Sequence, residues 1–212
     1  MKIDIKNINK SFKGNLVLNN VNMHFETSNI YGFSGRNGSG KSVLLKVLTG
    51  LYEADSGIIS INDKIINFQK EFVENLGSLI EGPKFFSNLT GFENLKFLAN
   101  IKGKIEEKDI LKALEIVNLI DEKDKKYSKY SLGMKQKLGI AAAIMENPDI
   151  LILDEPFNGI EDISVSKIKN YLKEIKENKI IILSTHIKED LEELSDYIYY
   201  FDAGMVSGNK YV

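Results

Sequence analysis

The sequence predicts an α/β fold with a parallel sheet, and three observations support this prediction. Residues 150–153 (ILIL) and 180–183 (IIIL) are continuous apolar runs, which are typical of strands buried on both faces of a parallel sheet. A glycine-rich segment, residues 35–42, lies between a stretch with strand character and one with helix character. From about residue 87 to 146 the apolar spacing becomes helical, which indicates a helical block inserted into one α/β core.

The elements before this block are strands and one helix. Predicted strands cover residues 2–8, 17–25, 30–34, 57–62 and 76–80. The strand at 30–34 leads into the glycine-rich segment, and residues 43–48 continue that segment as a helix. The strand at 76–80 ends at Glu81, because Gly82 and Pro83 follow it and break regular structure.

Three helices and then three strands follow. Thr90 and Glu93 have the spacing of a capping box, so a helix begins after Thr90 with Phe92, Leu95, Phe97 and Leu98 as its apolar positions. Further helices cover residues 106–118 and 131–145, and further strands cover 150–153, 180–183 and 197–201. The chain is therefore predicted to be one domain, 1–212, with a core at about 1–84 and 147–212 and a helical subdomain at about 85–146.

Composition limits the partners that the chain can have. Its 212 residues carry a formal net charge of −2, so no basic excess points to nucleic acid. The four lysines between residues 123 and 129 are interleaved with acidic residues, which favours a solvated surface over a phosphate track. There are no cysteines, and therefore no disulfides or thiol chemistry.

The start of the chain alternates like a strand and lacks the apolar stretch of a signal peptide. No apolar run approaches the eighteen or so residues that a membrane helix needs. We expect a soluble, cytoplasmic chain, which would serve a membrane only by docking on another protein.

The glycine-rich segment fits the phosphate-binding pattern G-x-x-x-x-G-K-[ST] at every fixed position. It consists of Gly35, Arg36, Asn37, Gly38, Ser39, Gly40, Lys41 and Ser42. Glycines let backbone N–H groups approach phosphate oxygens, and the following helix N-terminus attracts anions. Lys41 supplies a positive charge for the β- and γ-phosphates, and the Ser42 hydroxyl can ligate Mg²⁺. The pattern predicts that the segment binds a nucleoside triphosphate; the alternative is a glycine-rich turn without a ligand.

Two carboxylates, Asp154 and Glu155, follow the apolar run at 150–153. Ligands of open α/β sheets bind at the carboxyl ends of strands, which is where these residues stand. Asp154 suits Mg²⁺, directly or through water, and Glu155 suits a general base that orients or deprotonates the attacking water. The alternative is a strand followed by an acidic turn.

Residues 130–138 (YSLGMKQKL) contain a second motif. Through this motif the chain resembles the ATP-binding subunits of ABC transporters. That signature is usually written LSGGQ and stands some twenty residues before the acidic strand, as here. Tyr130, Ser131 and Gly133 take its first, second and fourth positions, whereas Leu132 and Met134 depart from the usual Gly and Gln. The resemblance covers essentially the whole chain, with the motifs in the family's order.

This resemblance implies a P-loop NTPase fold, with a RecA-like core, an antiparallel β subdomain and the inserted helical subdomain. It also implies a dimer in which ATP and Mg²⁺ lie between the phosphate loop of one subunit and the signature (Ser131, Leu132, Gly133 and Met134) of the other. A serine at a helix start offers a hydroxyl and free helix N–H groups to a γ-phosphate. An ordinary serine cap is the alternative at Ser131.

Other positions match the family one residue at a time. Glu161 ends the segment that corresponds to the family's D-loop, where Asp is usual, so its role between subunits is open. His186 follows the apolar run at 180–183 and matches the switch histidine, which hydrogen-bonds the γ-phosphate; the other histidine, His24, has no motif around it. Phe12 stands where the family places an aromatic ring against adenine, and a core position is the alternative.

Glu81 stands where the family normally has a Gln that touches Mg²⁺ or the attacking water. In this respect, and in the wording of its signature, the chain resembles the branch that exports bacitracin or confers immunity to lantibiotics. Our hypothesis is that Glu81 joins Ser42 and Asp154 at Mg²⁺ and takes part in catalysis by poising Glu155 as a base. The alternative is a solvent-facing Glu in a hinge.

The resemblance implies an ATPase that energises export, with an antibiotic or antimicrobial peptide as a possible substrate, through a separate integral membrane permease. The chain would then sit at the inner face of the cell membrane and pair with a second ATP-binding subunit, identical or not. Phe85 and Phe86 either line the groove for the permease or pack in the interior. An ATP-dependent regulatory or sensing protein without direct transport stays open. A P-loop kinase is disfavoured, because the signature and His186 would be unexplained.

Overall fold

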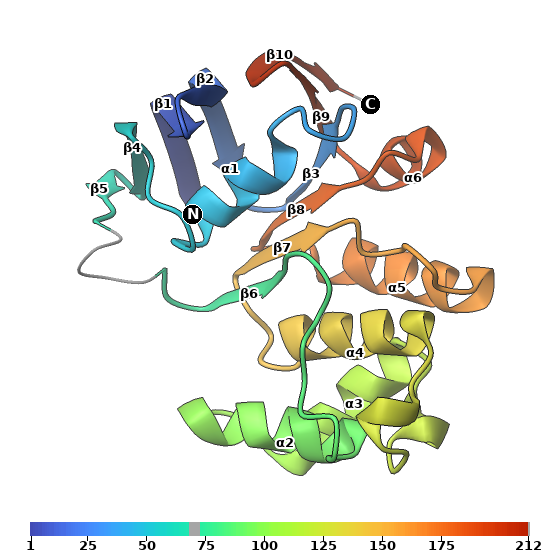
Figure 1. Cartoon of the computed structure of the whole chain (residues 1–212). Helices are drawn as coiled ribbons and strands as arrows, with labels where there is room; N and C mark the ends of the chain where they lie inside the picture. Colours follow the sequence, from blue (N-terminus) through green and yellow to red (C-terminus); the bar gives the residue numbers. More distant parts are fainter. Residues whose placement is uncertain (68–72, 212) are drawn as a thin grey trace.

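The computed structural model describes residues 1–67 and 73–211, except the side chains of residues 209–211 (Figure 1). The strands are β1 (Lys2–Phe12), β2 (Asn15–Glu26), β3 (Asn29–Ser34), β4 (Ser56–Ile61), β5 (Lys64–Ile65), β6 (Leu76–Leu79), β7 (Ile150–Asp154), β8 (Ile180–Ser184), β9 (Tyr197–Asp202) and β10 (Met205–Tyr211). The α-helices are α1 (Lys41–Leu48), α2 (Gly91–Lys102), α3 (Glu107–Ile116), α4 (Leu132–Ile144), α5 (Asp162–Ile175) and α6 (Lys188–Leu194). Two short 3₁₀ turns, Ile120–Glu122 and Tyr127–Lys129, connect α3 to α4.

The larger sheet has the order β10-β9-β3-β8-β7-β6. Its strands from β9 to β6 pair in parallel, and β10 joins the edge antiparallel to β9. Every residue of β7 and β8 is buried, which confirms the prediction drawn from the two apolar runs. Because β3, β7 and β8 are parallel, the segments that follow them meet at one edge of the sheet.

The smaller sheet is antiparallel, in the order β2-β1-β4-β5, and faces the larger one across α1 (Figure 1). The two sheets and α1 share one buried core. Phe25 from β2 and Leu44 and Leu45 from α1 pack there. Ile152 and Ile182 of the larger sheet belong to the same cluster. The first turn after the glycine-rich segment is thus held between two sheets.

Helices α2, α3 and α4 lie on the opposite side of the larger sheet (Figure 1). The predicted capping box is confirmed: Thr90 Oγ1 accepts a bond from Glu93 N (3.1 Å), and Glu93 accepts one from Thr90 N (2.7 Å). Leu95 and Leu138 share a buried cluster with Leu153 of β7, so these helices have a common core with the sheet. The division of the chain at about residues 85 and 146 stays a prediction.

Helices α5 and α6 and strand β10 have no counterpart among the sequence-based predictions. The buried positions of α5 are Ser164, Ile168, Lys169 and Leu172. Val165, Tyr171 and Ile175 pack against the same core as Ile168 and Leu172, so α5 carries an apolar stripe at helical spacing that the sequence reasoning missed. Lys169 is buried because it forms ion pairs with Asp190 and Glu193 of α6.

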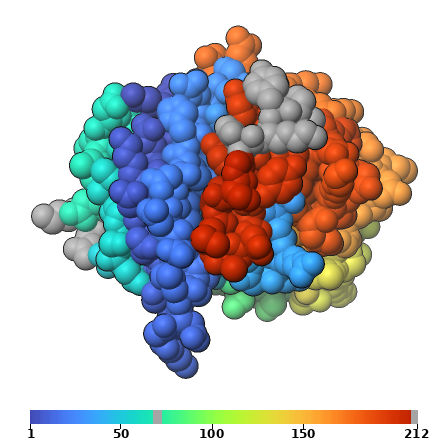
Figure 2. Space-filling view, turned by 90° about the horizontal axis from the view of Figure 1, so that it is seen from above, coloured from blue at the N-terminus to red at the C-terminus, as the bar shows by residue number. Residues whose placement is uncertain are grey.

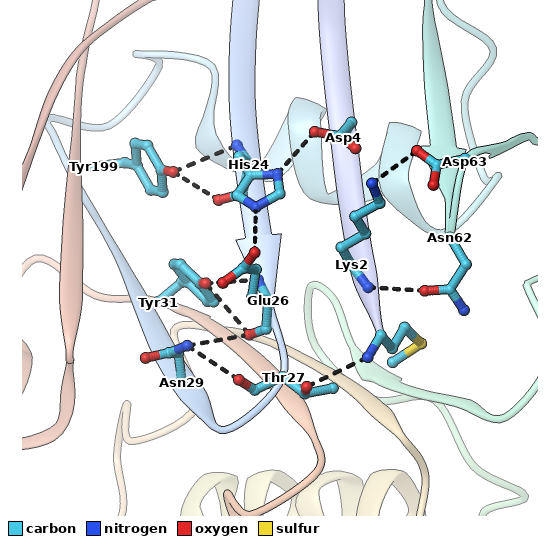
Figure 3. A network of polar contacts seen from close by, with 11 residues as sticks. Lys2, Asp4, His24, Glu26, Thr27, Asn29, Tyr31, Asn62, Asp63 and Tyr199 are labelled. Atoms are coloured by element: carbon cyan, nitrogen blue, oxygen red, sulfur yellow. Dashed lines mark hydrogen bonds and ion pairs between the residues drawn. The ribbon is translucent and has the colours of Figure 1, made fainter.

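The N-terminal and C-terminal strands lie side by side on one face of the molecule (Figure 2). Tyr199 of β9 donates from its hydroxyl to the carbonyl oxygen of His24 (2.8 Å), which ties the two sheets together (Figure 3). The His24 ring lies between two carboxylates, with Nδ1 2.7 Å from Asp4 and Nε2 3.1 Å from Glu26. His24 is therefore part of a structural polar network.

Candidate nucleotide-binding site

The glycine-rich segment forms the turn from β3 into α1, as its sequence predicts. Gly35 has to be glycine, because a Cβ atom there would lie 2.5 Å from the carbonyl oxygen of Phe201. Gly40 precedes the helix with φ at 107°, a conformation that L side chains rarely adopt. The segment borders a hollow of about 300 Å³, lined by Val17, residues 37–43 and Glu155.

Lys41 is buried within this loop. Its Nζ donates to the carbonyl oxygens of Gly35 (2.6 Å) and Arg36 (3.2 Å). Burial lowers the pKa of Lys41, and the nearby charges of Glu155 and Asp154 act in the opposite direction. The structure thus brings the predicted phosphate-binding cation and the predicted acidic pair close enough to influence each other.

Asp154 ends β7 with only 7% of its surface exposed, and it accepts a hydrogen bond from the Ser184 hydroxyl on β8. The backbone of Glu155 has φ at 47°, in the left-handed region. Three bonds hold it there: Glu155 N donates to both the carbonyl and the hydroxyl of Ser184 (3.1 Å each), and Gln136 donates to the Glu155 carbonyl (3.0 Å). A strained residue held by its surroundings is typical of functional sites.

His186 and Glu155, the two residues predicted for catalysis and switching, contact each other. His186 Nδ1 lies 2.9 Å from Glu155 Oε2, and 58% of the His186 side chain is exposed. The pair joins the segment after β8 to the segment after β7, which are adjacent because those strands are neighbours in the sheet.

Glu81 lies two residues after the end of β6, with φ at 62° and an exposed side chain. The contact that the structure shows for its carboxylate is an ion pair with Lys46 on α1. A hydrogen bond to Glu81 raises the pKa of Lys46, and burial opposes that shift. The predicted contact of Glu81 with Mg²⁺, and its predicted part in catalysis, stay predictions.

Phe12 ends β1 and is 37% exposed, so the alternative of a core position does not hold. Its ring meets the edge of the Tyr52 ring at a centroid distance of 5.3 Å, and Lys10 Nζ lies 5.3 Å from its centroid. Adenine stacking at Phe12 stays a prediction.

The four signature residues lie at the start of α4. Ser131 caps the helix, since its hydroxyl accepts a bond from Met134 N (3.2 Å), and Leu132 is 76% exposed. A Cβ atom on Gly133 would lie 2.2 Å from the Gly159 carbonyl oxygen, so the signature packs directly on the segment that follows Glu155. Within the described part of the chain, none of the four lines the hollow at the phosphate loop.

Glu161 is engaged within its own chain. It accepts hydrogen bonds from Lys137 of α4 (2.7 Å) and from Ser164 of α5 (2.5 Å). Partial burial acts to raise the pKa of Glu161, but these hydrogen bonds outweigh it and lower the pKa to about 2. Lys137 also donates to the carbonyl oxygen of Asn118 (3.2 Å), so one buried cation joins α3, α4 and the start of α5.

Sequence reasoning missed Ser184, Gln136 and Lys137, which hold Asp154, Glu155 and Glu161 in place. Ser184 could have been found, because it ends an apolar run just as Asp154 does. Gln136 and Lys137 carried no such signal, since their partners lie about 20 residues further along the chain.

Residues 18–158 match the family model described as ABC transporter. The chain is 40% identical over 205 residues to the bacitracin transport ATP-binding protein BcrA of Enterococcus faecalis, covering 92% of this chain and 65% of that protein. It is 35% identical to the lantibiotic transport ATP-binding protein SrtF of Streptococcus pyogenes, covering 96% of this chain and 88% of that one. The chain thus spans just under two thirds of the length of the BcrA relative.

Solved structures have the same fold. A structure of an ATP-binding subunit of an ABC transporter superimposes with a TM-score of 0.90 at 26% identity, over 100% of this chain and 90% of that one. A dimeric ATP-binding cassette in a post-hydrolysis state, bound to ADP and Pi, superimposes with a TM-score of 0.90 at 23% identity, over 99% and 98% of the two chains. The P-loop NTPase fold predicted from the sequence is confirmed.

Proposed function

This chain belongs to the ABC transporter family, and from that premise we propose that it is the ATP-binding and ATP-hydrolysing subunit of an exporter with a separate membrane permease. One observation carries the proposal: the phosphate loop, the acidic pair and the histidine meet at one edge of the larger sheet. The charges of Glu155 and Asp154 act on the pKa of Lys41, and His186 contacts Glu155. This is the arrangement that hydrolysis of a bound triphosphate requires.

Each residue has a part in the proposed reaction. Lys41 and the loop N–H groups bind the β- and γ-phosphates, and they stabilise the negative charge that develops there. Glu155 orients and deprotonates the attacking water, while His186, which contacts the Glu155 carboxylate, hydrogen-bonds the γ-phosphate. Ser184 and Gln136 fix the backbone from which Glu155 projects.

The donor set fits Mg²⁺ held jointly with nucleotide. Asp154 offers a buried carboxylate, and Ser42 offers a hydroxyl at the start of α1. Among residues 1–67 and 73–211, no group of three or more His, Asp and Glu side chains is arranged to hold a metal alone. Mg²⁺ typically binds through one or two protein groups together with substrate phosphates and water. Bound there, Mg²⁺ would offset the charge of the phosphates.

We further propose that the signature acts on the ATP of a second ATP-binding subunit. Leu132 exposes an apolar side chain at the start of α4, and Ser131 presents its hydroxyl and the helix N-terminus beside it. Neither residue lines its own chain's hollow. ATP would then bind to one subunit and be hydrolysed well only when the second closes over it.

An apolar surface formed by α2 and the segment that precedes it supports docking on a permease. Phe86 and Phe97 are about half exposed, their rings meet edge to face at 5.1 Å, and they line a hollow of about 230 Å³ with Leu98. Phe85 lines the same hollow and also packs against Tyr127 at a centroid distance of 5.4 Å. In the described part of the chain, no helix is long and apolar enough to cross a membrane.

The relatives that act on bacitracin and lantibiotics favour export of an antimicrobial peptide or antibiotic as the work that hydrolysis drives. Purification of the tagged chain from its own cells tests this point. A membrane permease in the complex supports transport, acting at the inner face of the membrane. A complex with a regulatory protein and no permease would contradict transport and favour the sensing alternative.

The substitution Glu155→Gln tests the catalytic assignment. It should keep ATP affinity, lower turnover by about a hundredfold or more, and favour an ATP-bound dimer in size-exclusion chromatography. Glu177→Gln is the matched control, because it removes an exposed carboxylate after α5. Turnover of Glu155→Gln equal to that of the control would rule out Glu155 as the base.

A further inference from the structure

Gln136 is a polar residue that is buried in the second turn of α4. Only 9% of its surface is exposed, and its side-chain amide nitrogen donates to two successive carbonyl oxygens, those of Glu155 (3.0 Å) and Pro156 (3.3 Å). A glutamine amide carries two N–H donors, so one side chain can serve both acceptors. Gln136 therefore bridges the first two peptide carbonyls after β7.

Strand β7 is held in a similar way at its other end. Lys179 is also buried, and its Nζ donates to the carbonyl oxygens of Asn147 (3.3 Å) and Pro148 (2.7 Å), which precede the strand. Each end of β7 is thus bordered by two successive carbonyls that one buried side chain bridges. The two bridges differ in what they hold, because only the bridge from Gln136 includes a residue assigned to the reaction.

The backbone of Glu155 is fixed on both sides of its Cα atom. Its N–H donates to Ser184 on one side, and its carbonyl accepts from Gln136 on the other. A residue has only two soft backbone dihedrals, so restraints on both flanking peptides set the direction of the Cα–Cβ bond. The left-handed φ of Glu155 needs such restraint, because residues with a side chain seldom adopt it. The carboxylate that this backbone directs meets His186 at 2.9 Å.

The same face of α4 reaches the segment after β7 at a second point. Gly133 stands three residues before Gln136, and residues three apart lie on one face of a helix. A Cβ atom on Gly133 would lie 2.2 Å from the Gly159 carbonyl oxygen. The helix that follows Ser131 therefore contacts the segment around Glu155 through its first two turns.

We propose that Gln136 is a positioning residue for hydrolysis, which keeps Glu155 aligned with His186 and with the attacking water. Through Gln136, the helix that begins with the signature positions the base of its own chain. Loss of the bridge lets the peptide between Glu155 and Pro156 rotate, and the carboxylate then leaves the orientation that proton transfer requires. The inference rests on the proposed function, because Glu155 is the base only there.

Two matched variants separate positioning from stability. Gln136→Met keeps the length of the side chain but removes both donors, and Lys179→Met removes the corresponding bridge at the other end of β7. Urea unfolding of the two variants measures how much stability each bridge contributes. Gln136→Asn retains the amide on a shorter side chain, and it takes the place of Gln136→Met if that variant does not fold.

The first measurement needs no nucleotide. The sequence has two histidines, so the ring protons give two sets of NMR signals, and His24→Gln identifies which set belongs to His186. At constant pH, the His186 signals should move by more than their linewidth in Gln136→Met and stay in place in Lys179→Met. Unmoved His186 signals in Gln136→Met, or an equal shift in both variants, would overturn the positioning of Glu155 by Gln136.

The second measurement is steady-state ATP hydrolysis. Gln136→Met should lower kcat about ten- to a hundredfold and leave KM within about twofold, because displacing a reacting group by about 1 Å has an effect of this size on the chemical step. Lys179→Met should change neither constant by more than about twofold. In the Glu155→Gln background, Gln136→Met should have no further effect, because it acts through Glu155.

A higher KM with unchanged kcat, or an equal loss of kcat in the two matched variants, would contradict the inference. A further loss in the Glu155→Gln background would contradict it as well. If the parent chain does not hydrolyse ATP, the proposed function fails instead. The His186 signals still decide in that case whether Gln136 positions Glu155, so the two failures are distinguishable.

Discussion

The phosphate-loop edge of the larger sheet and the start of α4 differ in how far one chain completes them. At the sheet edge, polar groups contact one another within the chain: Lys41 binds loop carbonyls, Ser184 binds Asp154, and His186 touches Glu155. At the start of α4, the Ser131 hydroxyl accepts a cap bond from the backbone of its own helix, and Leu132 is exposed.

This difference indicates a division of work between binding and closure. The sheet edge has its cation, carboxylates and histidine held in advance, which supports our proposal that one chain binds the triphosphate by itself. At the start of α4, the closest packing is made by the backbone, because Gly133 lies against the carbonyl of Gly159. The following four variants test this division, beginning with the largest expected effect.

Lys41→Met should weaken ATP binding about ten- to a hundredfold, because charge-assisted hydrogen bonds to the phosphates are lost. Isothermal titration calorimetry measures the affinity. The melting temperature without nucleotide should not fall, since a buried cation with a lowered pKa is removed. If the ATP affinity of Lys41→Met stayed within twofold of the parent, the assignment of ATP binding to the sheet edge would be wrong.

Gly133→Ala should destabilise the fold by about 1–3 kcal/mol and reduce ATP hydrolysis, because a methyl group would collide with the Gly159 carbonyl. ATP affinity of the monomer should remain. Gly82→Ala is the control for stability, as a Cβ atom there meets no atom within 4 Å. Urea unfolding and turnover measure the two effects. If Gly133→Ala left both the stability and the turnover unchanged, the close packing of Gly133 on Gly159 would matter for neither.

Ser131→Ala should cost about 1 kcal/mol through loss of the helix cap. Thr90→Ala removes the equivalent cap from α2 and should cost a similar amount. Comparing the two variants distinguishes the loss of a helix cap from the loss of a catalytic contact. Only Ser131→Ala should also lower the hydrolysis rate of the dimer. Equal hydrolysis rates in the two variants would favour the ordinary cap at Ser131.

His24→Gln should affect stability alone and by less than about 1 kcal/mol, because its side chain is 47% exposed. The hydrogen bond with Asp4 raises the pKa of His24, and burial opposes it. A raised pKa stabilises the fold below the unfolded value and loses that effect as pH rises through the folded value. The melting temperature difference from the parent should therefore be larger at pH 5.5 than at pH 8.5, with ATP affinity unchanged at both.

Much of the fold could be predicted where neighbouring residues carry the signal. The apolar runs of β7 and β8 and the capping box of α2 are local patterns, and all three are confirmed. Helix α5 was missed although Val165, Ile168 and Leu172 have helical spacing, whereas the burial of Lys169 follows only from its ion pair with Asp190 of α6.

The sequence by itself determined the phosphate loop and the placement of Asp154, Glu155 and His186 after buried strands. Eight consecutive residues are enough to predict the loop, because a glycine-rich backbone can supply phosphate contacts without help from distant residues. A parallel sheet gathers strand ends at one edge, which places the other three residues. Only the tertiary structure decided which charges meet: Glu81 with Lys46, and Glu161 with Lys137. These partners are 35 and 24 residues apart, and an acidic residue near several lysines has no preference until folding brings one of them into contact.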